Sequence, residues 1–282
     1  MRGASVTDSE VEGSLGIYLA FGLRLRSDLP LPELPIVARH DGPPDVEVRV
    51  FDAPGFDPAM REAGLADIAD DVAMLWWPGI GRFVVSDGSD IIVARAPGAD
   101  PALVRLYLLG PVLNALLHQR GWIVLRAGAA RIGDRVVAFV PGPGVSDALT
   151  GSGHTIIAED VLAIRAGDHT TPAVVQPCVP WLAQRPLDEA VARRLWCDAA
   201  RSNAPLPLDA LYVLNGDSER PDMLTHAEAF AELGACLFDD LTWPGDVRRA
   251  LRLMFHLAST LPVQRMSLES LASGDSLRDI RG

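Results

Sequence analysis

A Gly- and Pro-rich connection between two apolar segments most constrains the fold of this 282-residue chain. The stretch VVAFVPGPGVSDALTGSGHTIIAEDVLAI, residues 136–164, begins and ends with runs that have the pattern of buried strands. Only 14 residues lie between Val140 and Thr155. A loop plus a full crossover helix between parallel strands would need more. We therefore expect the helix after the first strand to be short or missing.

Strand patterns separated by turn signals fill the first third of the chain. Residues 15–26 are predicted as one strand and DVEVRVF as another, with Val46, Val48 and Val50 on one face and charged residues on the other. DVAMLWW, GRFVVSD and DIIVARA follow across Pro-Gly and Asp-Gly turn signals. We therefore predict a β-rich N-terminal module over residues 1–96, with one side of its sheet facing solvent.

Helical and strand patterns alternate in the remainder, which predicts an α/β core over residues 97–282. Asp100 and Pro101 favour a helix start, and Gly121 suits its end. WIVLRAGAARI and VVAFV are predicted as two strands joined by a hairpin turn at Gly133-Asp134. The further predicted elements are strands at TIIAEDVLAI, AVVQP, LDALYVL and VQRMSL, helices over residues 187–200 and 245–260, a helix opened by a Thr225/Glu228 capping box, and a short C-terminal helix.

Charge and cysteine usage argue against several functions. A formal net charge of -12 disfavours binding to nucleic acid or to an anionic membrane. The three cysteines have no CxxC spacing, which fits a reducing cytoplasm better than a disulfide scaffold or a zinc site. The N-terminus lacks the apolar stretch of a signal peptide, and Gly110-Pro111 interrupts LYLLGPVLNALL. We expect a soluble cytoplasmic protein, and self-association into a homo-oligomer stays open.

The order of these elements resembles the HPr serine kinase family, specifically the short kinase-like proteins of clusters that make lasso and related ribosomal peptides. Four stretches carry the resemblance, which covers most of the chain: FGLRLRSDLPLPELP, RLYLLGPVLNALLHQRGWIVLRAGAARIGDRVVAFV, GHTIIAEDVLAI and PCVPWL. It implies a P-loop kinase-like core with a Gly-rich Lys-Ser loop, an Asp-Asp pair in the next strand and a histidine before the hairpin. It also implies magnesium-dependent transfer of the ATP γ-phosphate to a serine of a precursor peptide or carrier protein.

The chain departs from this family pattern wherever the loop would handle phosphate. Pro141 takes the place of the first glycine, Ser146 that of the last, Asp147 that of the lysine and Ala148 that of the hydroxyl residue. All 25 basic residues are arginine, so no lysine can reach in from elsewhere. A carboxylate close to a triphosphate replaces attraction by a repulsion of roughly 1 to 4 kcal/mol, depending on the effective dielectric. We therefore predict a degenerate P-loop with weak or lost phosphotransfer.

The candidate nucleotide-binding residues are Gly142, Gly144 and Ser146, which would form a remnant anion nest. A flexible surface connection is the alternative reading. Glu159 and Asp160, in place of the family's acidic pair, are the candidate metal ligands and catalytic carboxylates. ATP and magnesium are expected as cofactors only if this ancestral site survives, and otherwise we expect none.

Two further candidate catalytic residues are His154 and Arg126. His154 would act as a general base oriented by Glu159 or Asp160, or would simply be solvated. Arg126 stands where the family's histidine is expected, and would pair with one of those acids across neighbouring strands or present its guanidinium to phosphate.

Three functions therefore stay open. The first is a peptide-binding or accessory pseudokinase in ribosomal peptide maturation. The second is an enzyme with an altered site, either an unusual ATP-dependent serine phosphotransferase or a catalyst of different chemistry that uses His154, Glu159 and Asp160. The third is a structural partner with an inert core.

Overall fold

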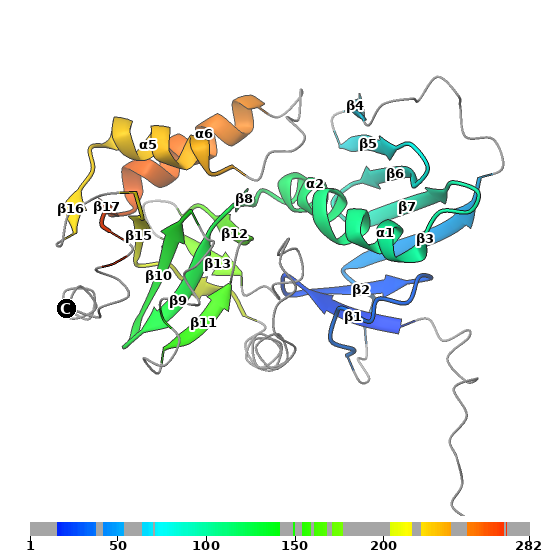
Figure 1. Cartoon of the computed structure of the whole chain (residues 1–282), viewed down its shortest axis with the longest axis horizontal. Coiled ribbons are helices and arrows are strands. Elements are labelled where there is room, and N and C mark those ends of the chain that lie inside the picture. The colour runs from blue at the N-terminus through cyan, green and yellow to red at the C-terminus, as the bar shows by residue number, and fades with distance from the viewer. Residues whose placement is uncertain are drawn as a thin grey trace, which may run out of the picture.

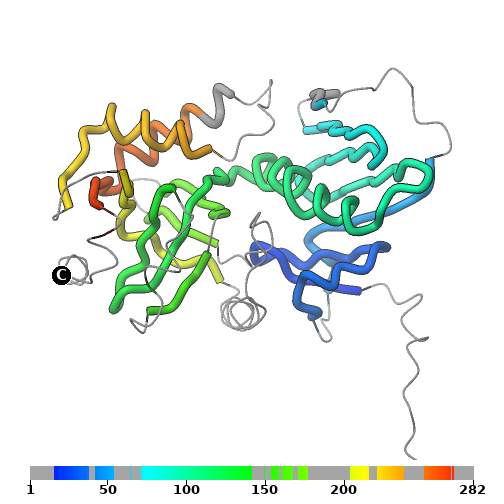
Figure 2. Tube along the Cα trace, viewed as in Figure 1, coloured from blue at the N-terminus to red at the C-terminus, as the bar shows by residue number. Residues whose placement is uncertain are grey.

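The computed structural model of the chain describes residues 16–37, 42–53, 64–69, 71–141, 149, 154–158, 161–167, 171–176, 204–215, 221–237, 247–267 and 269, and only the backbone of 65–69 and 247–250. These residues form a mixed α/β fold with many strands in three sheets and few helices (Figure 1). The chain runs from a sheet in the N-terminal half, through a long helical segment, to the other two sheets (Figure 2).

The N-terminal sheet has seven strands in the order β1-β2-β3-β7-β6-β5-β4. Strands β4 to β7 form an antiparallel meander, and β3 joins β7 and β2 in parallel. As the predicted alternation requires, Val46 and Val48 of β3 are buried on one face of the sheet, and Val50 is partly buried against the same core. The strands are β1 (Gly16–Ala20), β2 (Leu23–Ser27), β3 (Val46–Asp52), β4 (Gly64–Ala69), β5 (Val72–Trp77), β6 (Gly81–Ser86) and β7 (Asp90–Arg95).

The prediction of one strand over residues 15–26 is wrong, because this segment is a β1–β2 hairpin. Ala20 pairs with Leu23, which leaves a two-residue turn at Phe21-Gly22. Both turn residues have positive φ, 49° and 72°, as the type I′ hairpin turn demands. A bulky residue such as Phe21 rarely adopts this conformation, so the sequence carries only the glycine as a turn signal.

One helical segment covers the buried face of the N-terminal sheet. It comprises α1 (Pro101–Tyr107), a wider turn η1 (Leu108–Val112) and α2 (Leu113–Gln119). The predicted start is confirmed, because the Asp100 carboxylate accepts a hydrogen bond of 2.8 Å from the Ala102 amide. The predicted end is confirmed as well, with Gly121 at φ 81°. Tyr107 packs on Trp77 of β5 with ring centroids 4.4 Å apart, which joins helix to sheet.

Side chains at the end of α2 bind the turns of the N-terminal sheet. The Gln119 side chain donates to the carbonyls of Asp71 and Val85, both at 3.2 Å, and accepts from the Gly88 amide at 2.9 Å. By length and composition, this segment is the one candidate for a membrane crossing among the described residues, and half of it is buried inside the fold. Its contacts are those of a core helix.

The second half of the molecule contains two further sheets. The six-stranded sheet has the order β11-β9-β10-β15-β17-β16 and the four-stranded sheet the order β14-β13-β12-β8. Their strands are β8 (Ile123–Leu125), β9 (Gly128–Ile132), β10 (Arg135–Val140), β11 (Thr155–Ala158), β12 (Leu162–Arg165), β13 (Val174–Gln176), β14 (Leu206–Pro207), β15 (Ala210–Val213), β16 (Asp222–Met223) and β17 (Val263–Arg265). The strands predicted at AVVQP, LDALYVL and VQRMSL are thus confirmed.

Strands β10, β15 and β17 run parallel, as in an α/β fold. Helices α5 (His226–Ala235) and α6 (Val247–Thr260) lie between β15 and β17 in sequence, and in Figure 1 they lie together over the six-stranded sheet. Both predicted helices are therefore confirmed. The β9–β10 hairpin is confirmed too, with Gly133 at φ 62° in a two-residue turn.

Two runs that we predict as single strands are each divided between two sheets. WIVLRAGAARI gives β8 in the four-stranded sheet and β9 in the six-stranded sheet, with Arg126 and Ala127 between them. TIIAEDVLAI likewise gives β11 and β12. Residues before and after each break are buried, so the hydrophobic run does not mark the point where the strand changes sheet. The helices predicted over 187–200 and at the C-terminus lie outside the described residues.

Candidate functional site

The parallel strands of the six-stranded sheet end together at one edge. Val140 of β10 pairs with Val213 of β15, and Val213 pairs with Arg265 of β17, so these three residues form one row across the sheet. The Gly- and Pro-rich connection begins at Pro141, directly after this row. Ligands of open α/β sheets bind outside the carboxyl ends of the strands. This edge is therefore the candidate site.

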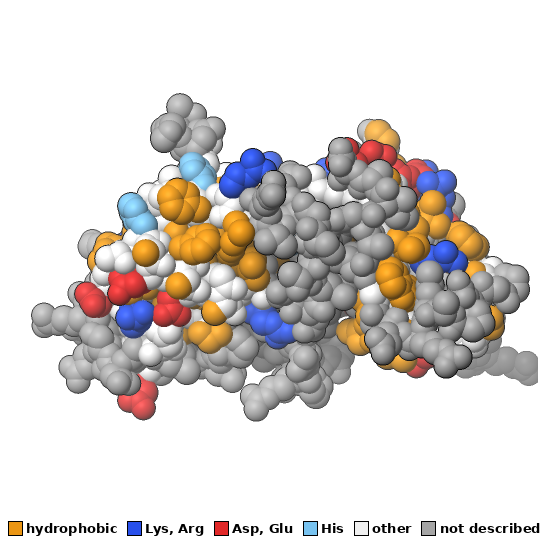
Figure 3. Space-filling view, turned by 90° about the horizontal axis from the view of Figure 1, so that it is seen from above, with side chains coloured by type: hydrophobic (Ala, Val, Ile, Leu, Met, Phe, Trp, Pro, Cys, Tyr) orange, Lys and Arg blue, Asp and Glu red, His pale blue; other side chains and the backbone are white. Residues whose placement is uncertain are grey.

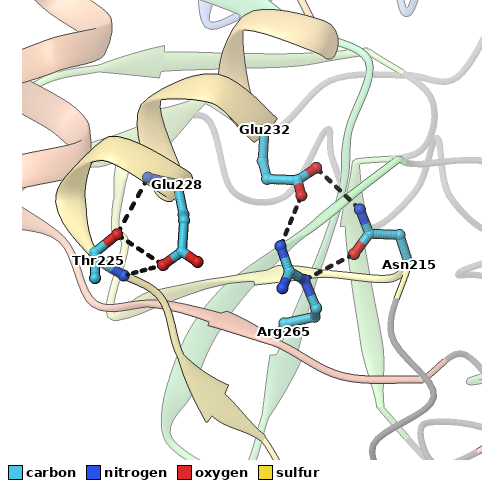
Figure 4. Close-up of polar contacts among 5 residues, drawn as sticks. All are labelled: Asn215, Thr225, Glu228, Glu232 and Arg265. Carbon is cyan, nitrogen blue, oxygen red and sulfur yellow. Dashed lines mark hydrogen bonds and ion pairs between the residues drawn. The ribbon is translucent and has the colours of Figure 1, made fainter.

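Three side chains form a closed polar triangle at the edge (Figure 4). The Arg265 guanidinium donates from Nε to Asn215 Oδ1 at 3.1 Å and from its Nη2 atom to Glu232 Oε1 at 2.9 Å. Asn215 Nδ2 donates to Glu232 Oε2 at 2.9 Å. Both carboxylate oxygens of Glu232 are therefore used inside the protein.

Helix α5 brings Glu232 to the triangle through a well-defined start. The Thr225 hydroxyl accepts from the Glu228 amide at 3.3 Å, and the Glu228 carboxylate accepts from the Thr225 amide at 2.9 Å. This reciprocal pair is the capping box predicted from the sequence. Glu228 and Glu232 are four residues apart, so they lie on the same side of the helix.

The edge is acidic around its arginine. Asp222 of β16 is the cross-strand partner of Arg265, and Glu232 forms the ion pair. The hydrogen bond from the Thr225 hydroxyl, together with the Thr225 amide, holds the pKa of Glu228 below its usual value, and the charge of Arg265 adds to this effect. The Arg265 guanidinium is thus already paired with Glu232, and acidic residues stand on both neighbouring elements, Glu228 on α5 and Asp222 opposite it on β16, so this edge is poorly suited to attract an anion.

The Cys236 thiol lies at the end of α5. Burial raises its pKa, and the negative charge of Glu232 raises it further. The thiol is therefore protonated at neutral pH and is a weak nucleophile.

Arg126 and His154 lie at different ends of the six-stranded sheet. Arg126 precedes Gly128, which pairs with Phe139 near the carboxyl end of β10, and its amide donates to the Cys236 carbonyl at 2.7 Å. His154 precedes Thr155, which pairs with Arg131, the partner of Val136 at the start of β10. His154 and Ala158 lie at opposite ends of β11, and the length of this strand places them about 13 Å apart.

The connection after Pro141 contributes one described residue to the core. Leu149 is helical and buried, and it packs in a small cluster with Phe139 and Tyr212 on the face of the sheet opposite the main core. The Phe139 and Tyr212 rings stack with centroids 5.7 Å apart. The candidate residues Gly142, Gly144, Ser146, Glu159 and Asp160 lie outside the described residues. Within the described ranges, no three His, Cys, Asp or Glu residues are grouped as a metal site would require.

Asn215, Glu232 and Arg265 were missed in the sequence analysis. The signals that could have found two of them are the position of Asn215 directly after the predicted strand LDALYVL and that of Glu232 one turn after the capping box. Arg265 lies inside the predicted strand VQRMSL and had no such signal. Comparison with known proteins adds no further assignment, because no family model and no curated protein matches the chain.

Proposed function

We propose that this chain is a diverged HPr-serine-kinase-like protein that acts as a peptide-binding or accessory pseudokinase in ribosomal peptide maturation. Its partner would be a precursor peptide or a carrier protein, its location the cytoplasm, and its ATP phosphotransfer weak or lost. The resemblance of the four sequence stretches supports the proposed pathway, and the electrostatics of the carboxyl edge support weak or lost phosphotransfer.

The acidic environment of Arg265 is the observation that carries the proposal. A kinase needs positive charge that is free to stabilise phosphoryl oxygens in the transition state. Asp147 stands where the family's loop lysine is expected, and the chain contains no lysine. The arginine at this edge is already neutralised by Glu232 and lies beside two further carboxylates, so it is a poor substitute.

Calorimetry with millimolar ATP tests the proposal, with and without magnesium. Wild type should bind no nucleotide under either condition, and circular dichroism of the same sample should show that it is folded. Asp160→Ala should behave like wild type, as should the matched control Asp71→Ala in the exposed turn before β5. Magnesium-dependent binding that Asp160→Ala abolishes and Asp71→Ala retains would reject the proposal.

An enzyme with an altered site is the second candidate, and the strand arrangement around Arg126 favours it. Leu125 pairs with Leu162 and Ala129 pairs with Ala158, so equal lengths of chain, 126–128 and 159–161, connect the two pairs. Arg126 therefore lies between two strand pairs whose other members, Ala158 and Leu162, flank Glu159 and Asp160 in the sequence. In that case the two carboxylates would hold magnesium and Arg126 would neutralise phosphate, and the calorimetric experiment would show binding that Arg126→Ala weakens.

A further inference from the structure

The turn of the β1–β2 hairpin is buried, although connections between strands ordinarily face solvent. Phe21 of the turn is 6% exposed and belongs to the same hydrophobic core as Val175 of β13. Gln176, the last residue of β13, is 3% exposed, which is unusual for a glutamine. A turn of the N-terminal sheet and the end of a strand of the four-stranded sheet are therefore buried in one core.

Gly22 provides the space that the Gln176 side chain occupies. A Cβ atom at position 22 would lie 2.5 Å from Gln176 Nε2 and 2.8 Å from Gln176 Cδ, which is well inside van der Waals contact. Gly22 also has φ 72°, so glycine is required there both by the turn conformation and by the close approach of Gln176. The N-terminal sheet and the four-stranded sheet therefore meet where position 22 has no side chain.

Gln176 lies at the level of the four-stranded sheet where the chain enters the second half. It pairs with Ala163 of β12, and Ala163 also pairs with Val124 of β8, so these three residues form one row across the sheet. Val124 is two residues after Trp122, where the second half begins. Because neighbouring strands are about 4.8 Å apart, Gln176 lies about 10 Å across the sheet from Val124. The hairpin turn thus contacts this sheet at a second point beside the covalent junction.

The four-stranded sheet leads directly into the candidate catalytic residues. Strand β8 ends at Leu125, one residue before Arg126, and β12 begins at Leu162, two residues after Asp160. The position of this sheet therefore sets the place from which both candidate segments leave it.

We propose that the β1–β2 turn is a conformational lock between the two halves, in which Gln176 fills the space above Gly22 and fixes the four-stranded sheet against the N-terminal sheet. We call Phe21, Gly22 and Gln176 the hairpin lock. With the lock in place, Arg126 leaves β8 from a fixed position. Without it, the four-stranded sheet keeps its attachment through α2 and β8 and moves about that junction. The lock is independent of the proposed pseudokinase function, since it uses no residue assigned to nucleotide or metal binding.

Hydrogen exchange of two matched glycine variants tests the lock. Gly98 also has φ 72°, but a Cβ atom there would meet no atom within 4 Å. Gly22→Ala and Gly98→Ala therefore introduce the same backbone strain, and only the first displaces Gln176. We expect Gly22→Ala to accelerate exchange in β12, β13 and the Arg126 amide at least about tenfold, with β6 unchanged. Gly98→Ala should leave exchange at all of these positions unchanged.

Substitution of Gln176 separates the lock from the turn. Gln176→Ala removes the side chain and leaves the hairpin turn intact, so it should accelerate the same amides even if Gly22→Ala does not fold. In the Gln176→Ala background, Gly22→Ala should add less than it does in wild type, because the new methyl group no longer meets an amide. Phe255→Ala is the surface control. Phe255 is 63% exposed on α6, and Figure 3 shows the hydrophobic side chains of this face from above, so exchange in β12 and β13 should not change.

Several outcomes would overturn the inference. The same exchange pattern in Gly22→Ala and Gly98→Ala would mean that glycine at position 22 serves the turn alone. Unchanged exchange in Gln176→Ala would mean that this side chain does not hold the four-stranded sheet. Faster exchange throughout the protein, β6 included, would show a global loss of stability in place of an opened lock. Fully additive effects of the two substitutions would show that Gly22 and Gln176 are not coupled.

Discussion

The N-terminal sheet and the six-stranded sheet bury their strands in different ways. In β5 and β6, buried and partly exposed side chains alternate, because one face lies against the helical segment and the other is more open. In β9 and β10, buried residues follow one another, because the main core covers one face and the cluster around Phe139 covers the other. A period of two therefore reports burial on one side, and a strand covered on both sides has no such period.

The largest effects should come from core phenylalanines, one in each half. Phe83 of β6 and Phe139 of β10 are both completely buried. Phe83→Ala and Phe139→Ala should each lower the free energy of unfolding by about 3 to 5 kcal/mol, because each leaves a cavity. Urea denaturation followed by circular dichroism measures both. A loss below about 1 kcal/mol for Phe139→Ala would show that the second face of the six-stranded sheet is not a packed core.

A substitution in α2, the helix between the two halves, should have the next largest effect on the free energy of unfolding. Leu116 of α2 is completely buried, and α2 packs against both β6 and β8. Leu116→Ala should lower the free energy of unfolding by about 2 to 5 kcal/mol. Hydrogen exchange should increase in peptides from both β6 and β8. The control Leu103→Ala, at a residue 41% exposed on α1, should change the free energy of unfolding by less than about 1 kcal/mol. Faster exchange in β8 alone would mean that the halves are not coupled through α2.

The helix caps should contribute smaller and similar amounts in the two halves. Asp100→Ala removes the cap of α1, and Thr225→Ala removes the capping box of α5. Each should lower the free energy of unfolding by about 1 kcal/mol in urea denaturation. Asp100→Asn and Thr225→Ser keep a side-chain acceptor and should recover most of the loss. If the conservative variants were as unstable as the alanine variants, capping would not be the cause.

The smallest effect should be a loss of stability at acid pH, to which one carboxyl group in each half of the molecule contributes. The hydrogen bonds from Arg24, with Nε 2.8 Å from the Asp45 carboxylate, hold the pKa of Asp45 below its usual value. The hydrogen bond from Thr225 does the same for Glu228. Each group stabilises the fold above its unfolded pKa of about 4. That contribution is lost as pH falls through the lower folded pKa.

Urea denaturation of variants over an acid pH series measures this effect. Asp45→Asn and Glu228→Gln should each flatten the decline of unfolding free energy below about pH 4. Asp134→Asn, at an exposed residue of the β9–β10 turn, is the control. An unchanged slope in both variants would mean that other carboxylates cause the acid sensitivity.

The sequence predicted the elements whose signals are local. The cap at Asp100, the turn at Gly133 and the capping box at Thr225 each depend on residues within four positions of one another. The changes of sheet at Arg126 and after Ala158 depend on which distant strands come alongside, and no local pattern records that. The triangle of Asn215, Glu232 and Arg265 was missed for the same reason, since its members meet only after β15, α5 and β17 have packed.

The attachment of α1 and α2 to the N-terminal sheet has a consequence for how this chain could be rearranged in evolution. Recombination that exchanged residues up to 96 would strip the helical segment of the sheet it covers and leave Gln119 without the turns at Asp71 and Gly88. An exchange that ended after Gly121 would keep the N-terminal sheet, the helical segment and the hydrogen bonds of Gln119 together. The segment of the N-terminal half that could be exchanged as one structural unit therefore includes the helical segment. Its junction with the rest of the protein lies just before Trp122.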